Sequence, residues 1–445
     1  MRLRLPASPA RPLLRTLLAA GLRAADPAAA MRRLVSRRGD RLTVGRCRYD
    51  LRRYDRVLAV GAGKASARMA QALERILGAR LDGGLVVVKH GYGAPTARVR
   101  IVEAGHPVPD RAGLRAAAQI RNLVAPLTKR DLLIVLLSGG ASSLLPAPVP
   151  GVSLRDKQRV TELLLRSGAT IREINGVRKH LSSIKGGRLA ASTDATIITL
   201  LLSDVLGDDP AAIGSGPTVP DPSTYADAVA TLQRYRIWGR VPRSIRAHLL
   251  SGRRGHRTET PKPGAARFRL LQRAIVGNNR SALRGVADAA EQSGLRTVLL
   301  PTAVTGEAGP AALRFALRAR RIAAGADSLK PPCCVIAGGE PTVTVRGTGK
   351  GGRAQEWAAA AAIAIAGLRN VWVAAFGTDG TDGPTDAAGA VVSGHMLTDA
   401  ARRQLDIRRA LRRHDTYPLL KKLNAHIVTG PTGTNVNDLY LLLIL

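Results

Sequence analysis

One glycine-rich stretch near the C-terminus combines backbone freedom with positive charge. Residues 338–356 read GGEPTVTVRGTGKGGRAQE. Glycine lets backbone N–H groups approach phosphate oxygens closely. Arg346, Lys350 and Arg353 add cationic side chains to the same stretch. The combination predicts a loop that binds an anionic, phosphorylated ligand.

A second glycine-rich stretch carries carboxylates instead. Residues 376–389 read FGTDGTDGPTDAAG and contain Asp379, Asp382 and Asp386. Carboxylate oxygens are hard ligands of the type that Mg²⁺ prefers. We therefore expect these three aspartates to supply metal ligands near the bound phosphate. The alternative interpretation of both stretches is two solvated, turn-rich loops.

A third candidate loop lies in the N-terminal half. The run GAGKAS at residues 61–66 follows an apolar segment, RVLAV, and precedes a helical pattern. It is not a Walker A motif, which needs four residues between its first Gly and Gly-Lys. It is also a poor dinucleotide fingerprint, because Ser66 occupies the third glycine position. Lys64 would start a helix after a strand, where its charge and the helix dipole favour an anion; the alternative is a tight turn with an exposed lysine.

More polar loops follow apolar runs further along the chain. The turn SGGASS at residues 138–143 offers hydroxyl and backbone donors but is not the G-x-S-x-G elbow of a nucleophilic serine. Residues 170–189 form a cationic helical stretch ending in Gly-Gly. Its basic side chains face either a phosphate or the solvent; they are Arg178, Lys179, Lys185 and Arg188. For His90 and His106, we favour a structural hydrogen-bonding role over catalysis.

The elements that must position these loops alternate between strand and helix. Continuous apolar runs at residues 56–60, 131–138 and 196–202 are typical of strands buried on both faces of a parallel sheet. Ligands bind at the carboxyl ends of such strands. Residues 252–265 are rich in charge, Gly and Pro, which predicts a linker or exposed loop before a second α/β unit. We expect domains at residues 1–262 and 263–445.

The N-terminus and the composition exclude several classes. The leucines between residues 13 and 22 predict an amphipathic helix that packs on a domain, in preference to a transit peptide. No run is long enough to span a bilayer. The net charge of +36 raises nucleic-acid binding, but the arginines are scattered, so we expect no specific nucleic-acid partner. Three cysteines without metal spacing suit a reducing cytoplasm.

Eight loop motifs, in order from about residue 11 to the end, resemble the glycerate 2-kinase family, whose C-terminal half is called the MOFRL domain. They are VGAGKAS, GHPVPD, LLSGGASSL, INGVRKHLSSIKGGRLA, LLLSDVLGDDPAAIGSGPTVPDPSTY, GGEPTVTVRGTGKGGR, GTDGTDGPTDAAGA and TGPTGTNVNDLY. The resemblance implies phosphorylation of D-glycerate by ATP with Mg²⁺, giving 2-phosphoglycerate. It implies an N-terminal Rossmann-like domain, a C-terminal α/β domain with a MOFRL core at about residues 332–440, and an active site between them.

The resemblance also implies roles for individual residues. The family's catalytic pair maps onto Lys64 and Arg353. Residues expected to bind substrate or nucleotide lie in the glycine-rich loops: Gly63, Ser138, Gly139, Gly140, Ser142, Lys185, Asp204, Gly214, Ser215, Gly216, Glu340, Lys350, Thr378 and Asp379. Asp204 and Asp379 are both candidates for the general base. Ala354 departs from the family pattern, which has Asn there, and a lost amide would slacken the positioning of Arg353.

Two other functions and the oligomeric state stay open. Some family members carry the label hydroxypyruvate reductase, which would need an acidic residue about 20 positions after the Gly loop; residues 76–90 offer only Asp82. A polyanion-binding protein without catalysis is the other alternative. The sequence leaves open a homodimer, and it does not say which loop holds ATP and which holds glycerate.

Overall fold

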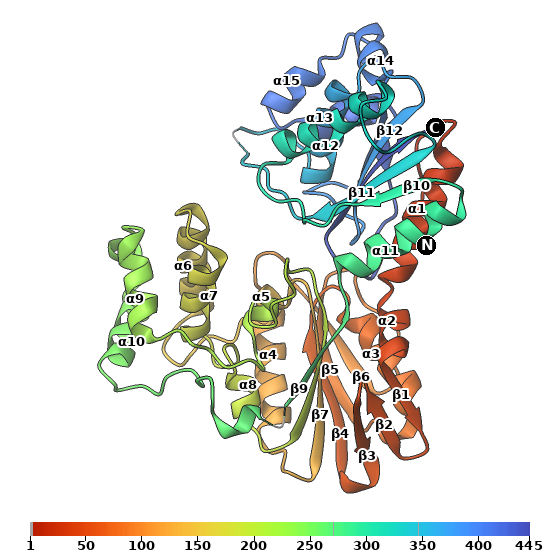
Figure 1. The fold of residues 1–445 in the computed structure, drawn as a ribbon. Coiled ribbons are helices and arrows are strands. Elements are labelled where there is room, and N and C mark those ends of the chain that lie inside the picture. Colours follow the sequence, from red (N-terminus) through yellow and green to blue (C-terminus); the bar gives the residue numbers. More distant parts are fainter. Residues whose placement is uncertain (1–2, 270, 346) are drawn as a thin grey trace. The chain divides into compact units, whose positions relative to one another are not determined.

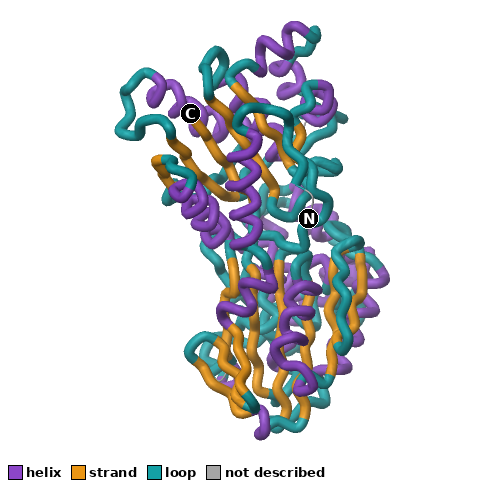
Figure 2. Tube along the Cα trace, turned by 90° about the vertical axis from the view of Figure 1, so that its right-hand side faces the viewer, coloured by secondary structure: helices purple, strands orange, loops and turns teal. Residues whose placement is uncertain are grey.

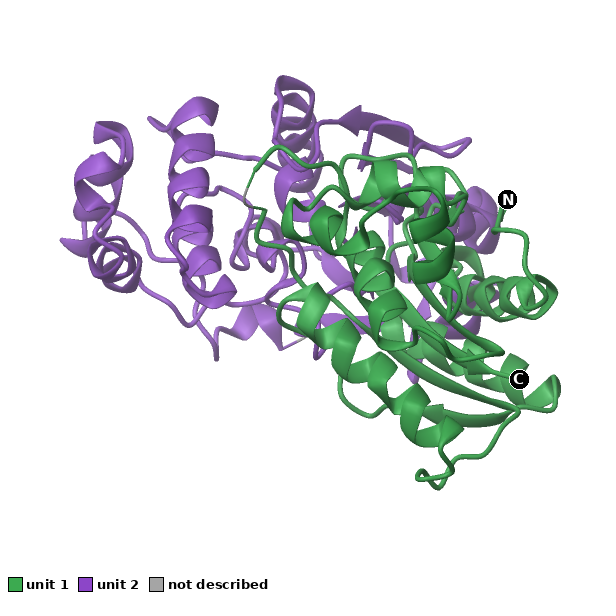
Figure 3. Ribbon diagram, turned by 90° about the horizontal axis from the view of Figure 1, so that it is seen from above, with its two compact units in different colours: residues 1–29, 277–445 green, residues 30–276 purple. Residues whose placement is uncertain are grey.

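The computed structural model describes residues 3–269, 271–345 and 347–445. Contacts divide the chain into unit 1, residues 1–29 and 277–445, and unit 2, residues 30–276 (Figure 3). This division differs from the predicted domains at 1–262 and 263–445, because the N-terminal segment packs with the C-terminal half. Arg346, one of the predicted phosphate-binding cations, lies outside the described residues.

Unit 2 is built on a six-stranded sheet with the order β6-β5-β4-β7-β8-β9 (Figure 1). All pairs from β6 to β8 are parallel. The strands are β4 (Arg56–Ala62), β5 (Gly83–Lys89), β6 (Val99–Ala104), β7 (Asp131–Ser138), β8 (Thr196–Leu202) and β9 (Gln272–Gly277). A small antiparallel sheet precedes them, formed by β1 (Val35–Arg38), β2 (Arg41–Val44) and β3 (Cys47–Asp50).

Helices cover both faces of the main sheet, as the fully buried β7 requires. Leu133, Val135 and Leu137 pack in one core cluster with Ile120 of α4 (Arg111–Val124). Successive strand residues point to opposite faces, so the alternate residues of β7 face α3 (Ser66–Leu77), which packs against β4, β5 and β7. The two-layered covering agrees with the α/β sheet that the apolar runs predict.

A separate helical layer of unit 2 has its own apolar core. The helices are α6 (Leu154–Arg166), α7 (Ile171–His180), α9 (Tyr225–Arg234) and α10 (Arg243–Arg253), and their core includes Val160, Ile174, Tyr225 and Leu249. Two short helices, α5 (Ala141–Leu144) and α8 (Arg188–Ala191), connect this layer to the sheet. Figure 2 shows the helices in purple and the strands in orange.

The predicted linker at 252–265 is part of unit 2. The Thr260 hydroxyl is buried and donates to Asp221, and the Asp221 N–H donates to the Pro261 carbonyl. The segment is therefore held on the helical layer at residues 260 and 261, while residues 253–258 are exposed, in line with the exposed loop that was the other prediction.

Unit 1 contains a mixed six-stranded sheet with the order β10-β11-β15-β12-β13-β14. Only the β10–β11 pair is parallel among these strands. The strands are β10 (Arg296–Leu299), β11 (Cys333–Gly339), β12 (Val371–Gly377), β13 (Gly389–Ser393), β14 (His426–Ile427) and β15 (Asp438–Ile444). The helices are α1 (Arg11–Ala24), α11 (Asn279–Gln292), α12 (Ala308–Ala323), α13 (Arg353–Ala364), α14 (Met396–Arg402), α15 (Ile407–Arg412) and α16 (Thr416–Lys422); α2 (Pro27–Leu34) crosses the boundary between the units.

The N-terminal helix is structural, as predicted. Leu14, Leu17, Leu18 and Leu22 of α1 are buried, and α1 packs closely against α11. A side chain on Gly21 would collide with α11 and β15, so this glycine permits the close approach. Within the described ranges, every helix is too short or too polar to span a membrane.

Candidate active site

The GAGKAS loop of unit 2 is fastened to the end of the neighbouring strand β7. The Ala65 N–H donates to the Ser138 hydroxyl at 3.0 Å, and the two hydroxyls of Ser66 and Ser138 lie 3.0 Å apart. The Lys64 N–H donates to the Gly139 carbonyl at 2.8 Å. Gly63 has a φ of +137°, and a Cβ there would lie 2.1 Å from the Ser138 hydroxyl. The glycine is thus required by close packing, and the loop places Lys64 at the start of α3.

Lys64 lies beside the second glycine loop. A Cβ on Gly140 would sit 3.7 Å from Cγ of Lys64 and 2.9 Å from the ring of His106. Gly140 has a φ of +87° and precedes the short helix α5. Three loops that follow β4, β6 and β7 therefore meet at the carboxyl edge of the sheet. This is where ligands bind in sheets of this kind.

Lys185 joins the loops at 138–142 and 214–216, all of which the sequence predicted as binding elements. Its Nζ donates to the Ser142 carbonyl at 2.8 Å, the Ser142 hydroxyl at 3.2 Å and the Gly214 carbonyl at 3.3 Å. The hydroxyls of Ser142 and Ser215 lie 2.9 Å apart, and the Ser215 hydroxyl donates to Asn175. The structure brings these predicted residues together, and Gly216 continues the loop by accepting from the Gly187 N–H at 2.8 Å.

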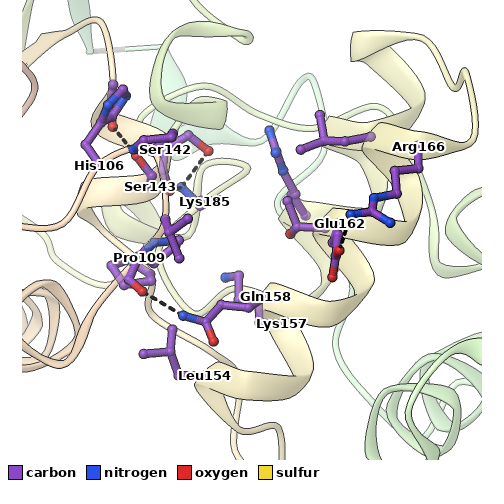
Figure 4. Close-up of a pocket in the computed structure, with 17 residues that line it drawn as sticks. His106, Pro109, Ser142, Ser143, Leu154, Lys157, Gln158, Glu162, Arg166 and Lys185 are labelled. Carbon is purple, nitrogen blue, oxygen red and sulfur yellow. Dashed lines mark hydrogen bonds and ion pairs between the residues drawn. The ribbon is translucent and has the colours of Figure 1, made fainter. Parts of the chain in front are cut away.

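A cavity of about 500 Å³ opens next to this network (Figure 4). We call it the α6 cavity. Helix α6 forms one wall with Leu154, Lys157, Gln158, Glu162 and Arg166, whereas His106, Ser142, Ser143 and Lys185 line the opposite side. Pro107, Val108, Pro109, Gly140, Pro146, Thr161, Leu165 and Arg178 complete the lining.

Three cations of the α6 cavity are depressed in pKa by burial. Burial, together with the charge of Arg178, lowers the pKa of Lys157 to about 7. Burial also lowers the pKa of Lys185 well below its usual value, with Lys157 and Arg178 adding to the effect. The three oxygen acceptors around the Lys185 Nζ oppose that shift. Arg178 has its pKa lowered by burial as well, so the cavity concentrates costly positive charge.

Of the four basic residues predicted in the stretch 170–189, two line the α6 cavity and two do not. Arg178 and Lys185 are in its wall. Lys179 instead forms a buried ion pair with Asp221 at 3.3 Å. Arg188 points to the Tyr225 hydroxyl and the Thr258 carbonyl.

Arg353 of unit 1 is held by two carboxylates. Its Nε donates to one oxygen of Asp438 at 2.7 Å, and Nη2 donates to the other at 3.1 Å. Nη1 donates to Glu340 at 2.8 Å. Burial opposes the charge of the guanidinium, but Asp438 and Glu340 outweigh it, so the pKa of Arg353 is raised. The Tyr440 hydroxyl also donates to Asp438 at 2.9 Å, which completes a rigid anchor for Arg353.

The aspartates predicted as metal ligands serve separate structural roles. Asp382 accepts from the Ala354 N–H at 3.0 Å and the Gln355 N–H at 2.8 Å, so it caps the N-terminus of α13. Burial and the charge of Asp438 raise the pKa of Asp382 to about 6. Asp386 accepts from the Tyr417 hydroxyl at 2.6 Å. No cluster of three or more His, Cys, Asp or Glu suited to a metal occurs in the described part of the chain.

The remaining predicted site residues have the following surroundings. Lys350 is exposed, and its Nζ lies 4.8 Å from the centre of the Tyr417 ring. The buried Thr378 hydroxyl donates to the Asn437 carbonyl at 2.6 Å. Asp379 accepts from the Thr381 N–H at 3.0 Å. Asp204 is half-buried after β8.

The resemblance implies that an amide at residue 354 would help to position Arg353, and the structure buries Ala354. The residue is fully buried within the apolar core of unit 1, in the same cluster as Trp357 and Tyr440. Its Cβ therefore contributes to packing beneath α13, whereas Arg353 emerges at the helix end. An amide at residue 354 would enter this apolar core.

Sequence reasoning missed two charged residues of these sites. Asp438 lies at the start of β15 in the quoted motif NVNDLY, and a lone acid directly before the apolar run LYLLLIL was the available signal. Lys157 lies on an amphipathic helix whose other charges are solvated, so nothing local distinguishes it. Helix α6 packs against α7 and α10, and Lys157 is buried there with its Nζ on the Leu181 carbonyl at the end of α7.

Comparison with known proteins shows the family to which this chain belongs. A family described as "Domain of unknown function (DUF4147)" matches residues 13–250, and the MOFRL family matches residues 333–438. The chain is 39% identical to the glycerate 2-kinase of Pyrococcus horikoshii over 96% of each chain. It is 42% identical to a putative hydroxypyruvate reductase of Agrobacterium vitis over 98% of this chain and 94% of the relative.

The structural comparison agrees. The crystal structure of the glycerate kinase from Thermotoga maritima matches with a TM-score of 0.84 and 38% identity, covering 98% of this chain and 99% of that chain. Together these matches define a two-unit protein with DUF4147 and MOFRL regions. The chain belongs to the glycerate kinase family.

Proposed function

We propose that the protein transfers the γ-phosphoryl group of ATP to the 2-hydroxyl of D-glycerate, forming 2-phosphoglycerate and ADP. The observation that carries the proposal is the match, over nearly the whole chain, to proteins named glycerate 2-kinase and glycerate kinase. The cationic carboxyl edge of the parallel sheet in unit 2 supports an anionic substrate.

Phosphoryl transfer depends on positioning and charge neutralisation more than on covalent chemistry. Lys64 starts α3 beside the loop at Gly140, where its ammonium would neutralise the transferring phosphoryl group. Arg353 would act on the same group. Because Asp438 holds Nε and Nη2, the group that exchanges partners is Nη1, and an incoming phosphoryl oxygen would displace Glu340 from it.

Mg²⁺ would enter as its complex with ATP and neutralise the phosphates. Asp379, Asp382 and Asp386 do not assemble into a ligand set, because Asp382 caps α13 and Asp386 binds Tyr417. No step is therefore assigned to a metal held by the protein. For deprotonation of the 2-hydroxyl, Asp204 and Asp379 remain the two candidates.

Reduction of hydroxypyruvate is less compatible with unit 2. A nicotinamide site needs an acid for the ribose near the Gly loop, at the carboxyl edge of the sheet. The Asp82 carboxylate accepts from the Val57 N–H at 2.7 Å, at the start of β4 and therefore at the opposite end of that strand from the loop. Asp82 cannot reach a ribose bound at residues 61–66.

The proposed function is tested with D-glycerate, ATP and Mg²⁺ in an assay that couples ADP formation to NADH oxidation. The phosphorylated product is then identified by phosphorus NMR. We expect 2-phosphoglycerate, and no NADH oxidation when hydroxypyruvate replaces glycerate and the coupling enzymes are omitted. Formation of 3-phosphoglycerate, or NADH-dependent reduction alone, would contradict the proposal.

The shared action of Lys64 and Arg353 on one phosphoryl group has its own test. Residues that stabilise one transition state together show non-additive losses when both are removed. We expect the variant carrying both Lys64→Ala and Arg353→Ala to lose less than the product of the two single losses. Strict multiplication of the two effects would indicate independent roles.

A further inference from the structure

Among the described residues that line the α6 cavity, positive charges outnumber negative charges. The Nζ of Lys157 donates to one neutral oxygen, the Leu181 carbonyl, at 3.2 Å. Lys185 is likewise bonded to carbonyl and hydroxyl oxygens. Glu162, the carboxylate among the lining residues, is already paired with Arg166 at 2.9 Å and Arg159 at 3.3 Å.

Buried cations without a counter-charge are costly unless a ligand supplies the opposite charge. Lys157 and Lys185 are more than nine-tenths buried, with 6% and 1% of their surfaces exposed. Both line the cavity together with Arg178. Three cations lining one cavity match a chain of phosphates better than a single carboxylate.

Another part of the cavity lining is apolar and exposed to solvent. Val108 and Leu165 are large apolar side chains with 64% and 61% of their surfaces exposed. Leu154 and Pro146 add to this apolar lining. A three-carbon acid such as glycerate has no apolar surface to bury here, whereas a planar base does. The volume of about 500 Å³ lies within the range of about 300–1,000 Å³ in which a drug-sized ligand is largely enclosed.

The cavity also leads to the residue proposed to act on the phosphoryl group. Gly140 and His106 belong to its lining, and Lys64 lies next to Gly140. A nucleotide with its base at Val108 and Leu165 would therefore direct its phosphates past Lys157 and Lys185 toward Lys64.

We propose that the α6 cavity is the site of the phosphoryl donor: it binds a nucleoside triphosphate, with the base on Val108, Leu154 and Leu165 and the polyphosphate along Lys157, Arg178 and Lys185. Glycerate binds elsewhere. The assignment rests on the proposed kinase function. Lys157 is then a donor-binding residue on a helix outside the glycine-rich loops.

The test compares two variants with matched controls, each checked for folding by its circular dichroism spectrum and melting temperature. Lys157→Met removes the cation and keeps an unbranched side chain one atom shorter, and Leu165→Glu places a carboxylate on the apolar part of the lining. The controls are Lys330→Met and Leu317→Glu on the surface of unit 1, where Lys330 is exposed and Leu317 has 48% of its surface exposed. Calorimetry measures binding of a non-hydrolysable ATP analogue and of inorganic tripolyphosphate in the absence of glycerate.

We expect Lys157→Met to lower the affinity for both ligands by about tenfold or more, the loss typical of one charge-assisted contact. Leu165→Glu should lower the affinity for the ATP analogue much more than the affinity for tripolyphosphate, because only the analogue carries a base. Both variants should raise the KM for ATP and leave the KM for glycerate within about twofold, as expected when binding to one substrate alone is lost. Controls should bind as the parent protein does.

Three results would overturn the assignment. They are unchanged binding of the analogue by both variants, equal weakening of both ligands by Leu165→Glu, and a raised KM for glycerate with an unchanged KM for ATP. Binding is measured without the acceptor, so the two proposals fail separately. If the parent protein binds the analogue in this cavity but does not phosphorylate glycerate, the proposed function falls and the nucleotide site stands.

Discussion

The cations of the two units have different kinds of partner, neutral oxygens in unit 2 and carboxylates in unit 1. In unit 2, Lys157 and Lys185 lie against carbonyl and hydroxyl oxygens, which orient an ammonium without cancelling its charge. In unit 1, Arg353 is bound by the carboxylates of Asp438 and Glu340, which cancel its charge and fix its plane. The first arrangement favours capture of a polyanion. The second holds one guanidinium in a fixed orientation, and displacement of Glu340 would free Nη1 for a ligand.

The largest effects are expected at Lys64 and Arg353. Lys64→Ala and Arg353→Ala should each lower kcat by about 10²-fold or more, the loss typical of a removed transition-state donor or charge. Steady-state kinetics on folded variants measure this effect. If either variant keeps a kcat near that of the parent protein, its assignment as a catalytic residue is wrong.

The next effect sharpens the comparison within unit 1. Asp438→Asn should lower kcat by about tenfold, because a charged bidentate anchor that orients Arg353 is replaced by a weaker one. Glu340→Gln is the matched control: it removes the displaceable carboxylate and should change kcat less. The KM for ATP should move little in Asp438→Asn. A loss of melting temperature with unchanged kcat would show that Asp438 only stabilises the fold.

A third prediction separates packing from catalysis at residue 354. Ala354→Asn places an amide in a filled apolar core and should destabilise unit 1 by about 1–3 kcal/mol. Denaturant unfolding measures this loss, and Ala401→Asn, at an exposed position on α14, provides the control. The kinetics should remain unchanged. Improved kcat/KM for glycerate without a loss of stability would restore a role for this position in the site.

The smallest effect concerns the pH dependence of unit 2. The pKa of Lys157 is about 7 in the folded chain, beside Arg178 and Lys185, against a usual value of 10.5. Between these values the unfolded chain binds the proton and the folded chain does not, so this group makes stability rise with pH by up to about 1.4 kcal/mol per unit. Below pH 7 Lys157 is charged in both the folded and the unfolded chain, so the full destabilisation from burying this charge remains. Lys157→Met should therefore raise the melting temperature most at low pH, and an equal shift at pH 6 and pH 10 would refute the buried charge.

Much of the fold could be predicted from the chain because its information is local. Runs such as DLLIVLLS at β7 can be buried only on both faces of a sheet, and the polar turns at their ends identify the ligand edge. The resemblance names residues of the loops at 138–142 and 214–216, together with Lys185, as binding residues; the structure brings them together, and their binding role stays a prediction. The amphipathic helix at the N-terminus could be predicted in the same way, although its partner α11 lies more than 250 residues away.

Tertiary structure decided what each charged side chain does. The sequence by itself determined the α/β class, the glycine-rich loops and the cationic character of the site. Asp382 resembles a metal ligand in the sequence, but it caps α13 because the chain folds back to place it at that helix end. Lys157 resembles a solvated lysine, but it is buried where α6 packs against α7, with its Nζ on the Leu181 carbonyl. The physical reason is that charge and periodicity are local properties, whereas burial and pairing depend on segments far apart in the chain.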